Sequence, residues 1–240
     1  MDTTQSPTAI PRLVEMVTAS TRYLGALSEL SDDDVGAASL LPGWSRGHVI
    51  THLARNADAL GNLLHWAESG TERYMYDSPE QRDRDIEEGA GRSAHELRVD
   101  SAAAAGRFLQ AINELDVGHE DAQVSRAPGQ PTFPARMIAI LRLVELEVHH
   151  ADLDIGYTHE DWDPALADLL LDRVLEDRVD GPAMVLRSND TGGLWRYGVE
   201  GQGPQIEGRA GDLAWWVIGR GDGARLTSDA GLLPALGKWR

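Results

Sequence analysis

The 240-residue chain contains no cysteine. This absence excludes disulfide bonds, protein thiolate nucleophiles, iron–sulfur clusters and cysteine-based zinc sites. A metal site in this chain must therefore use histidine, aspartate and glutamate side chains. Any thiol chemistry must use a thiol that is supplied from outside the protein.

Positively charged side chains are scarce. The chain has 22 lysine and arginine residues against 39 aspartate and glutamate residues, which gives a formal net charge of −17. The phosphate groups of a nucleic acid would repel such a protein, and no basic stripe offsets the repulsion. We therefore expect a solvated acidic surface and no nucleic-acid partner.

Long apolar runs are missing too. No stretch approaches about eighteen consecutive apolar residues, so no membrane span is predicted. Residues 1–16 contain an early acid and no continuous apolar segment, so no signal peptide is predicted. With 42% hydrophobic and 25% charged residues, the composition is typical of a folded protein. We expect a cytoplasmic monomer that works on small molecules and not at a membrane.

Apolar residues at three-to-four spacing predict long helices in the first part of the chain. The four predicted helices cover residues 8–30, 46–67, 93–115 and 135–153. Ser45 is the expected N-cap of the second helix, and the acidic run at 31–34 ends the first. Residues 69–92 are charged and irregular, with a short helix after Pro79. This pattern is typical of a four-helix bundle with a polar lid segment.

The pattern changes near residue 160. A helix is predicted from Pro164 to about 179, followed by three short strands. The strands are Met184–Arg187, Leu194–Val199 and Gln205–Glu207, and helices follow at 209–219 and 229–238. We therefore predict an α+β protein with two domains, a four-helix bundle over 1–158 and a smaller α+β domain over 159–240.

Glu145 and His149 lie four residues apart, which places their side chains one turn apart on the same face of the last bundle helix. This spacing lets a carboxylate oxygen and an imidazole nitrogen reach one metal ion. His52, close to the apolar stripe of the second helix, is the candidate third ligand from a facing helix. Three protein ligands leave a position open for water or substrate, which is typical of catalytic zinc.

Other interpretations of these residues stay open at this point. A histidine on an apolar helix face is often a hydrogen-bonded core residue, and a Glu–x3–His pair is often an intrahelical contact without a metal. His48 and His52 are also four apart and form a rival pair. Helical phase predicts that Glu147, His150 and His159 are solvated.

Three segments, in order along the chain, resemble the signatures of one known family. The first is Leu41-Pro42-Gly43-Trp44-Ser45 with Val49, His52-Leu53-Ala54 and Asn56-Ala57-Asp58. The second is Arg142-x2-Glu145-x3-His149-x2-Asp152-Leu153, and the third is Asp212-Leu213-Ala214-Trp215-Trp216-x2-Gly219-Arg220. The family is that of the DinB-like mycothiol-dependent maleylpyruvate isomerases. In it, a DinB-like metal-binding four-helix bundle precedes a sterol-carrier-like domain, and the resemblance covers nearly the whole chain.

The resemblance implies roles for individual residues. The implied metal ligands are His52, Glu145 and His149. The implied metal ion is divalent, and zinc is the expected metal. Arg220 is implied to be the catalytic arginine at the active-site cleft, and Asp152 to orient a ligating histidine or to pack the helix. Arg82 and Arg84 in the lid segment are secondary candidates for contact with the substrate. Trp44 and the pair Trp215–Trp216 are expected to be packing residues.

The activity implied by the resemblance is the isomerisation of maleylpyruvate to fumarylpyruvate. A metal deprotonates the thiol of mycothiol, whose sulfur adds to the cis double bond. The adduct rotates about the new single bond, and elimination of the thiol leaves the trans product. A protein without cysteine fits this chemistry, because the nucleophile belongs to the cofactor. Two alternatives are a mycothiol S-transferase that releases the adduct, and a non-enzymatic metal- or lipid-binding protein.

Overall fold

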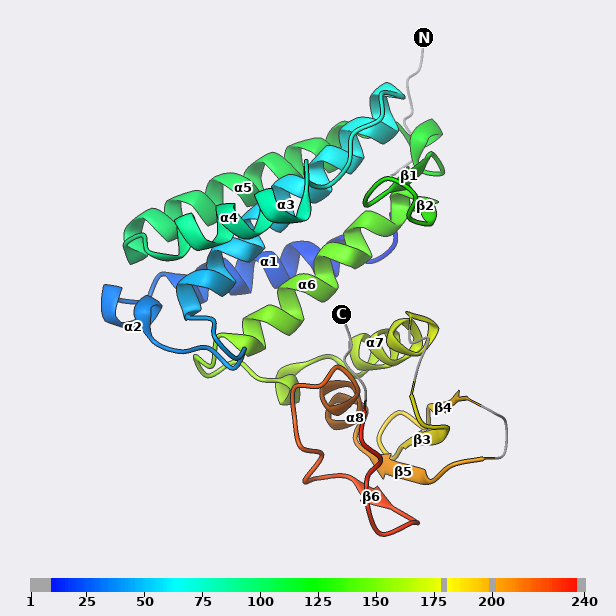
Figure 1. The fold of residues 1–240 in the computed structure, drawn as a ribbon. Coiled ribbons are helices and arrows are strands. Elements are labelled where there is room, and N and C mark those ends of the chain that lie inside the picture. Colours follow the sequence, from blue (N-terminus) through cyan, green and yellow to red (C-terminus); the bar gives the residue numbers. More distant parts are fainter. Residues whose placement is uncertain (1–9, 178–180, 199–201, 237–240) are drawn as a thin grey trace. The chain divides into compact units, whose positions relative to one another are not determined.

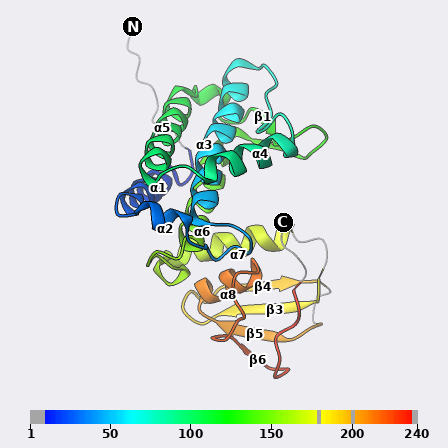
Figure 2. The same ribbon diagram turned by 60° about the vertical axis from the view of Figure 1, so that its left-hand side comes forward.

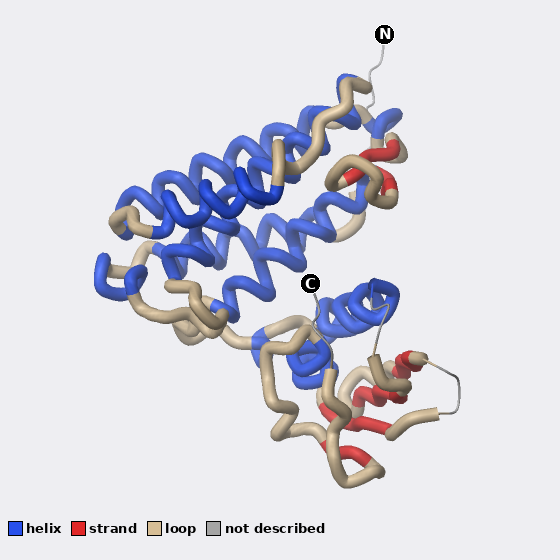
Figure 3. Tube along the Cα trace, viewed as in Figure 1, coloured by secondary structure: helices blue, strands red, loops and turns tan. Residues whose placement is uncertain are grey.

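The structure is a computed structural model that describes residues 10–177, 181–198 and 202–236. The chain divides into two compact units, Met1–Ile155 and Gly156–Arg240 (Figure 1). Helices make up most of the first unit, and a sheet with helices forms the second (Figure 3). The predicted fold class, a helical domain followed by a smaller α+β domain, is confirmed.

Four long helices build the first unit. They are α1 (Leu13–Leu27), α3 (Arg46–Ser69), α5 (Ala94–Glu114) and α6 (Ile138–Asp152). α3 packs against α5 and α6, and α1 packs against α5 and α6. The apolar stripe predicted for the second helix is buried; it consists of Val49, Leu53, Ala57, Leu60 and Leu64. The core of this unit therefore surrounds α3.

Two shorter helices complete the first unit. α4 (Pro79–Ala90) begins at Ser78, whose hydroxyl accepts a hydrogen bond from the Gln81 amide, and it confirms the helix predicted after Pro79. It packs so closely on α3 that a Cβ on Gly89 would collide with the Thr51 side chain. The lid segment is thus held against a helix that carries a candidate ligand.

Residues 31–36 differ from the prediction. The first helix already ends at Leu27, before the acidic run, and the run forms a short helix of its own, α2 (Asp32–Gly36). Ser31 and Asp34 cap each other's backbone amides in a capping box, which makes the run a helix start and not only a break. A small hairpin of β1 (Gln123–Ser125) and β2 (Thr132–Pro134) before α6 was not predicted.

The second unit is a four-stranded sheet with two helices. The strands are β3 (Met184–Ser188), β4 (Leu194–Tyr197), β5 (Gln205–Gly208) and β6 (Thr227–Ser228), in the order β4-β3-β5-β6. β3 pairs with β5 in parallel, and the other two pairings are antiparallel. The helices α7 (Pro164–Asp177) and α8 (Ala210–Val217) pack on each other and on the sheet (Figure 2).

The helix predicted over 229–238 is wrong for the part that the structure describes. Residues 229–236 form turns and loop, since Gly231 takes a left-handed φ of 80°. The end of that prediction, 237–238, lies outside the described residues, as do 178–179 of the predicted α7 and Val199 of the predicted β4. No described helix is both long and apolar enough to cross a membrane.

Candidate metal centre

A capping box fixes the start of the helix that carries His52. Ser45 has extended backbone angles, its hydroxyl accepts from the His48 amide, and its own amide donates to Nδ1 of His48 at 3.1 Å. Ser45 is therefore the N-cap of α3, as predicted. His52 lies two helical turns after this cap and is 6% exposed.

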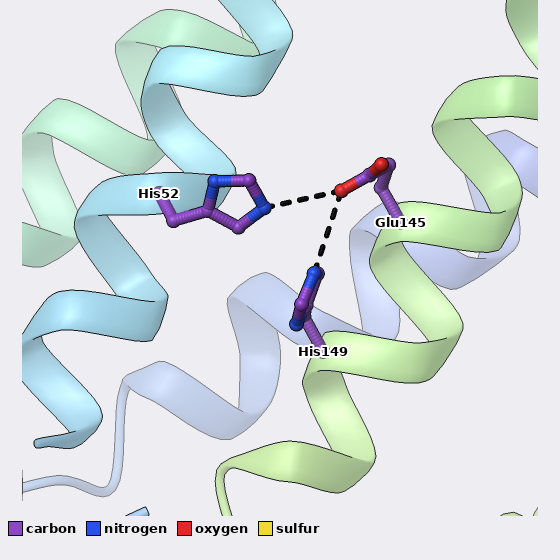
Figure 4. Close-up of side chains that lie close together, drawn as sticks. All are labelled: His52, Glu145 and His149. Atoms are coloured by element: carbon purple, nitrogen blue, oxygen red, sulfur yellow. Dashed lines mark hydrogen bonds and ion pairs between the residues drawn. The ribbon is translucent and has the colours of Figure 1, made fainter. Parts of the chain in front are cut away.

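α6 supplies the other two side chains from one face. Glu145 and His149 lie one turn apart, and Nε2 of His149 is 3.5 Å from Oε2 of Glu145. The same carboxylate oxygen lies 3.1 Å from Nε2 of His52, across the gap between α3 and α6 (Figure 4). One ligand atom from each of the three residues lies within 4.8 Å of the others. The structure thus brings together the three residues that the sequence singled out.

The rival pair of His48 and His52 does not converge. Nδ1 of His48 is occupied by the α3 capping box, and its Nε2 faces Glu87 at 3.3 Å. Among the residues that the structure describes, the group formed by His52, Glu145 and His149 is the one cluster with three possible metal ligands. Glu145 also contacts a second helix, so its pairing with His149 is more than an intrahelical contact.

The charges of the cluster suit a cation. Burial lowers the pKa of His52 to about 4, so its imidazole is neutral near pH 7. Burial alone would raise the pKa of Glu145, but hydrogen bonds to His149 and His52 outweigh it and leave that pKa well below its usual range. Burial would lower the pKa of His149, yet its bonds to Asp152 and Glu145 raise it. His52 and Glu145 therefore favour the forms that bind metal, a neutral imidazole and an ionised carboxylate, whereas His149 would release a proton when a metal binds.

An outer partner orients one of the histidines. Nδ1 of His149 lies 2.8 Å from Oδ2 of Asp152, whose side chain is fully buried. The backbone carbonyl of Asp152 accepts from the Leu40 amide at 2.8 Å, which holds the end of α6 in place. Asp152 can thus accept from Nδ1–H of His149, so that loss of the Nε2 proton to a metal would leave the Nε2 lone pair facing the cluster.

A family model described as the mycothiol maleylpyruvate isomerase N-terminal domain matches residues 17–154. The chain belongs to this family. Its structure is similar to the crystal structure of the mycothiol-dependent maleylpyruvate isomerase (28% identity, TM-score 0.89) and to that of a histidine-to-alanine mutant of the isomerase (27%, 0.87). Each comparison covers 95% of both chains. A search of curated proteins gives no match. The resemblance seen in the sequence is confirmed.

A buried arginine, to which the sequence analysis assigned no role, joins the two helices that carry the ligands, α3 and α6, by hydrogen bonds. Arg142 is 3% exposed, and its Nη1 donates to the Leu53 carbonyl at 2.9 Å and to Oδ1 of Asn56 at 2.8 Å. Leu53 follows His52 directly, and Arg142 lies one turn before Glu145. The sequence signal for this contact was the presence of Asn56 in the first family signature and of Arg142 in the second.

The three arginines proposed for substrate contact lie in different places. Arg82 on α4 reaches His52, with Nη2 3.4 Å from Nδ1. Arg84 does not reach it and instead donates to Gln81 on the exposed side of the same helix. Arg220 follows α8 in the second unit and donates to the Ile218 carbonyl at 3.1 Å. Its catalytic role stays a prediction.

Three residues predicted to be solvated are largely buried. Glu147 (6% exposed) receives a 2.5 Å hydrogen bond from Arg22 of α1, and the ring of His150 (3% exposed) packs edge-on to Tyr23. The prediction was wrong because α1 covers the face of α6 that lies away from α3. His159 is also enclosed, and its partners belong to the second unit.

Proposed function

We propose that this protein is an enzyme that isomerises maleylpyruvate to fumarylpyruvate with mycothiol as its thiol cofactor, at a divalent metal ion bound by His52, Glu145 and His149. The observation that carries the proposal is the convergence of two imidazole nitrogens and one carboxylate oxygen within 4.8 Å. Nitrogen and oxygen donors without sulfur suit zinc among other divalent ions. The family assignment supplies the reaction.

The chemistry needs a thiolate and a site for negative charge. A divalent metal in this site would lower the pKa of a coordinated thiol. Addition of the sulfur to the cis alkene makes the central bond single, rotation follows, and elimination regenerates both the thiol and a trans alkene. Asp152 keeps the His149 ring oriented, and Arg142 fixes the spacing of α3 and α6. Arg220 stabilises the charge that builds up on the diketo-acid oxygens.

The proposed working context is simple. The enzyme acts in the cytoplasm as a monomer, and its partners are a small-molecule substrate and a low-molecular-weight thiol. No partner protein, nucleic acid or membrane is needed for the proposed reaction.

The decisive experiment incubates the zinc-loaded protein with maleylpyruvate and a substoichiometric amount of mycothiol. We expect complete conversion to fumarylpyruvate, with all the mycothiol recovered, in proton NMR spectra. Consumption of one thiol per substrate, with a stable adduct, would contradict an isomerase and indicate a transferase. Absence of any reaction would remove the enzymatic proposal.

The proposed role of Arg220 has its own test. Arg220→Ala should keep one metal per chain and lower turnover by about a hundredfold, as expected when one donor to developing negative charge is lost. Unchanged turnover in this variant would remove Arg220 from the mechanism. Arg187→Ala, which removes an exposed charge from β3 of the same unit, is the control.

A further inference from the structure

The two nitrogens of His52 face opposite kinds of group. Nε2 faces the carboxylate of Glu145 at 3.1 Å, and Nδ1 faces Nη2 of Arg82 at 3.4 Å. The guanidinium carbon of Arg82 lies 5.9 Å from the centre of the Tyr76 ring. Arg82 therefore rests on an aromatic face beside the candidate metal centre.

His149 shows what a ligating histidine needs. A histidine that binds a metal through Nε2 carries its ring proton on Nδ1, and that proton needs an acceptor. For His149 the acceptor is Asp152, at 2.8 Å. In the metal-free protein Nε2–H of His52 can donate to Glu145 while Nδ1 accepts from Arg82. A metal on Nε2 would move the ring proton to Nδ1, where it would face a guanidinium, which has five N–H donors and no acceptor. Among the described residues, no acceptor is hydrogen-bonded to this nitrogen.

An anion would resolve this pairing of two donors. One carboxylate oxygen can accept from Nδ1–H of His52 and from Arg82 at once. For this the two nitrogens need to be about 4–5 Å apart instead of 3.4 Å, since each N–H···O bond spans about 2.9 Å. The long side chain of Arg82, 31% exposed, can make that small movement.

Arg82 is also the arginine at this centre whose positive charge is available to bind an anionic ligand. Its ion pair is with Asp83, the next residue, whose side chain is 69% exposed, and such surface pairs contribute little. Arg142 is committed to Leu53 and Asn56 in the core, and Arg55 is held by Asp58 and Asp100. Arg82 can turn to a ligand without leaving a buried charge unpaired.

We propose that Arg82 and Nδ1–H of His52 form a carboxylate-binding subsite beside the metal centre, which selects electrophiles that carry a carboxylate. The inference rests on the proposed metal site and deepens the proposed function, because it names the residues that recognise the carboxylate of the substrate. The guanidinium binds the carboxylate and positions the electrophile, and the histidine gains its missing acceptor from the substrate. A neutral electrophile would satisfy neither donor.

The test measures binding of maleate, a cis-dicarboxylate, to the zinc-loaded protein by calorimetry without any thiol. Wild type should bind maleate and not its neutral dimethyl ester. Arg82→Gln should weaken maleate binding at least tenfold and keep one zinc per chain. Arg82→Lys should recover part of the affinity, because lysine restores the positive charge but not the planar guanidinium that donates two parallel hydrogen bonds to a carboxylate. Arg92→Gln, which removes an exposed charge just beyond α4, is the control and should bind as wild type does.

Three results would overturn the proposal. They are no maleate binding by wild type, unchanged binding by Arg82→Gln, and loss of zinc from Arg82→Gln, which would make Arg82 a structural support of His52. In the isomerase assay, the KM for maleylpyruvate should rise in Arg82→Gln while the KM for mycothiol stays the same. Maleate binding requires no turnover, so it can succeed even if the proposed isomerisation fails.

Discussion

Each of the two units holds a largely buried histidine that is hydrogen-bonded to an aspartate, but among the described residues only the pair in the first unit belongs to a candidate metal centre. In the first unit, His149 bonds Asp152 at 2.8 Å. In the second, His159 bonds Asp212 at 3.0 Å, and the guanidinium of Arg225 lies 3.9 Å from the same carboxylate. The pairs resemble each other in composition and burial.

The difference lies in what surrounds each ring. The other ring nitrogen of His149, Nε2, lies 3.5 Å from Oε2 of Glu145, and His52 from another helix completes the set. His159 instead stacks on Trp215, with ring planes 5° apart and centres 5.2 Å apart, and Arg225 supplies positive charge to its aspartate. A histidine–aspartate pair orients an imidazole. A metal centre additionally needs converging donors from a second element.

Removing one histidine from each unit gives the largest expected effect. His149→Ala should weaken zinc binding by more than about a hundredfold, because a ligand is lost and not merely its outer partner. His159→Ala should keep one zinc per chain, since its ring lies against Trp215. Metal analysis after dialysis measures both. Equal zinc loss in the two variants would contradict the conclusion that His149 binds the metal and His159 does not.

Asparagine substitutions at the two aspartates test the orienting role. Asp152→Asn keeps an acceptor oxygen for the His149 ring but loses its charge, and zinc affinity should fall about 10- to 100-fold. Asp212→Asn is the matched change at His159 and should leave zinc affinity unchanged. Competition with a chelator of known affinity gives both dissociation constants. A full-affinity Asp152→Asn would show that the orientation of His149 comes from packing alone.

The sequence predicted the local parts of this contrast. Helical periodicity placed Glu145 and His149 on one face, and the turn before α3 identified Ser45 as its cap. The pairing of His52 with that face depends on how α3 and α6 pack; the place of His52 near an apolar stripe made it a candidate, and the family resemblance strengthened that prediction. Spacing alone could not separate the pair at His149 from rival histidines.

The failures have a common physical cause. Glu147 was expected in water because a bundle helix usually has one solvated face, but α6 is covered by α1 as well as by α3. Arg142 gave no local signal because a buried arginine is stable only when distant carbonyl and amide groups accept from it. Both depend on contacts between segments far apart in the sequence.

The smallest expected effect concerns the helix starts. Ser45→Ala removes the side-chain cap of α3 and should lower the free energy of unfolding by about 1 kcal/mol. Ser93→Ala removes the equivalent cap of α5, which carries no ligand, and serves as the control. Thermal unfolding with zinc titration should show similar destabilisation in both variants, with weakened zinc binding only in Ser45→Ala. In the second unit, by contrast, the N-cap residue of α8, Arg209, makes no side-chain cap, and the carboxylate of Asp190 accepts from the Ala210 amide instead. If Ser45→Ala and Ser93→Ala changed zinc affinity equally, the position of His52 would depend on the stability of the whole bundle and not on the local start of its helix.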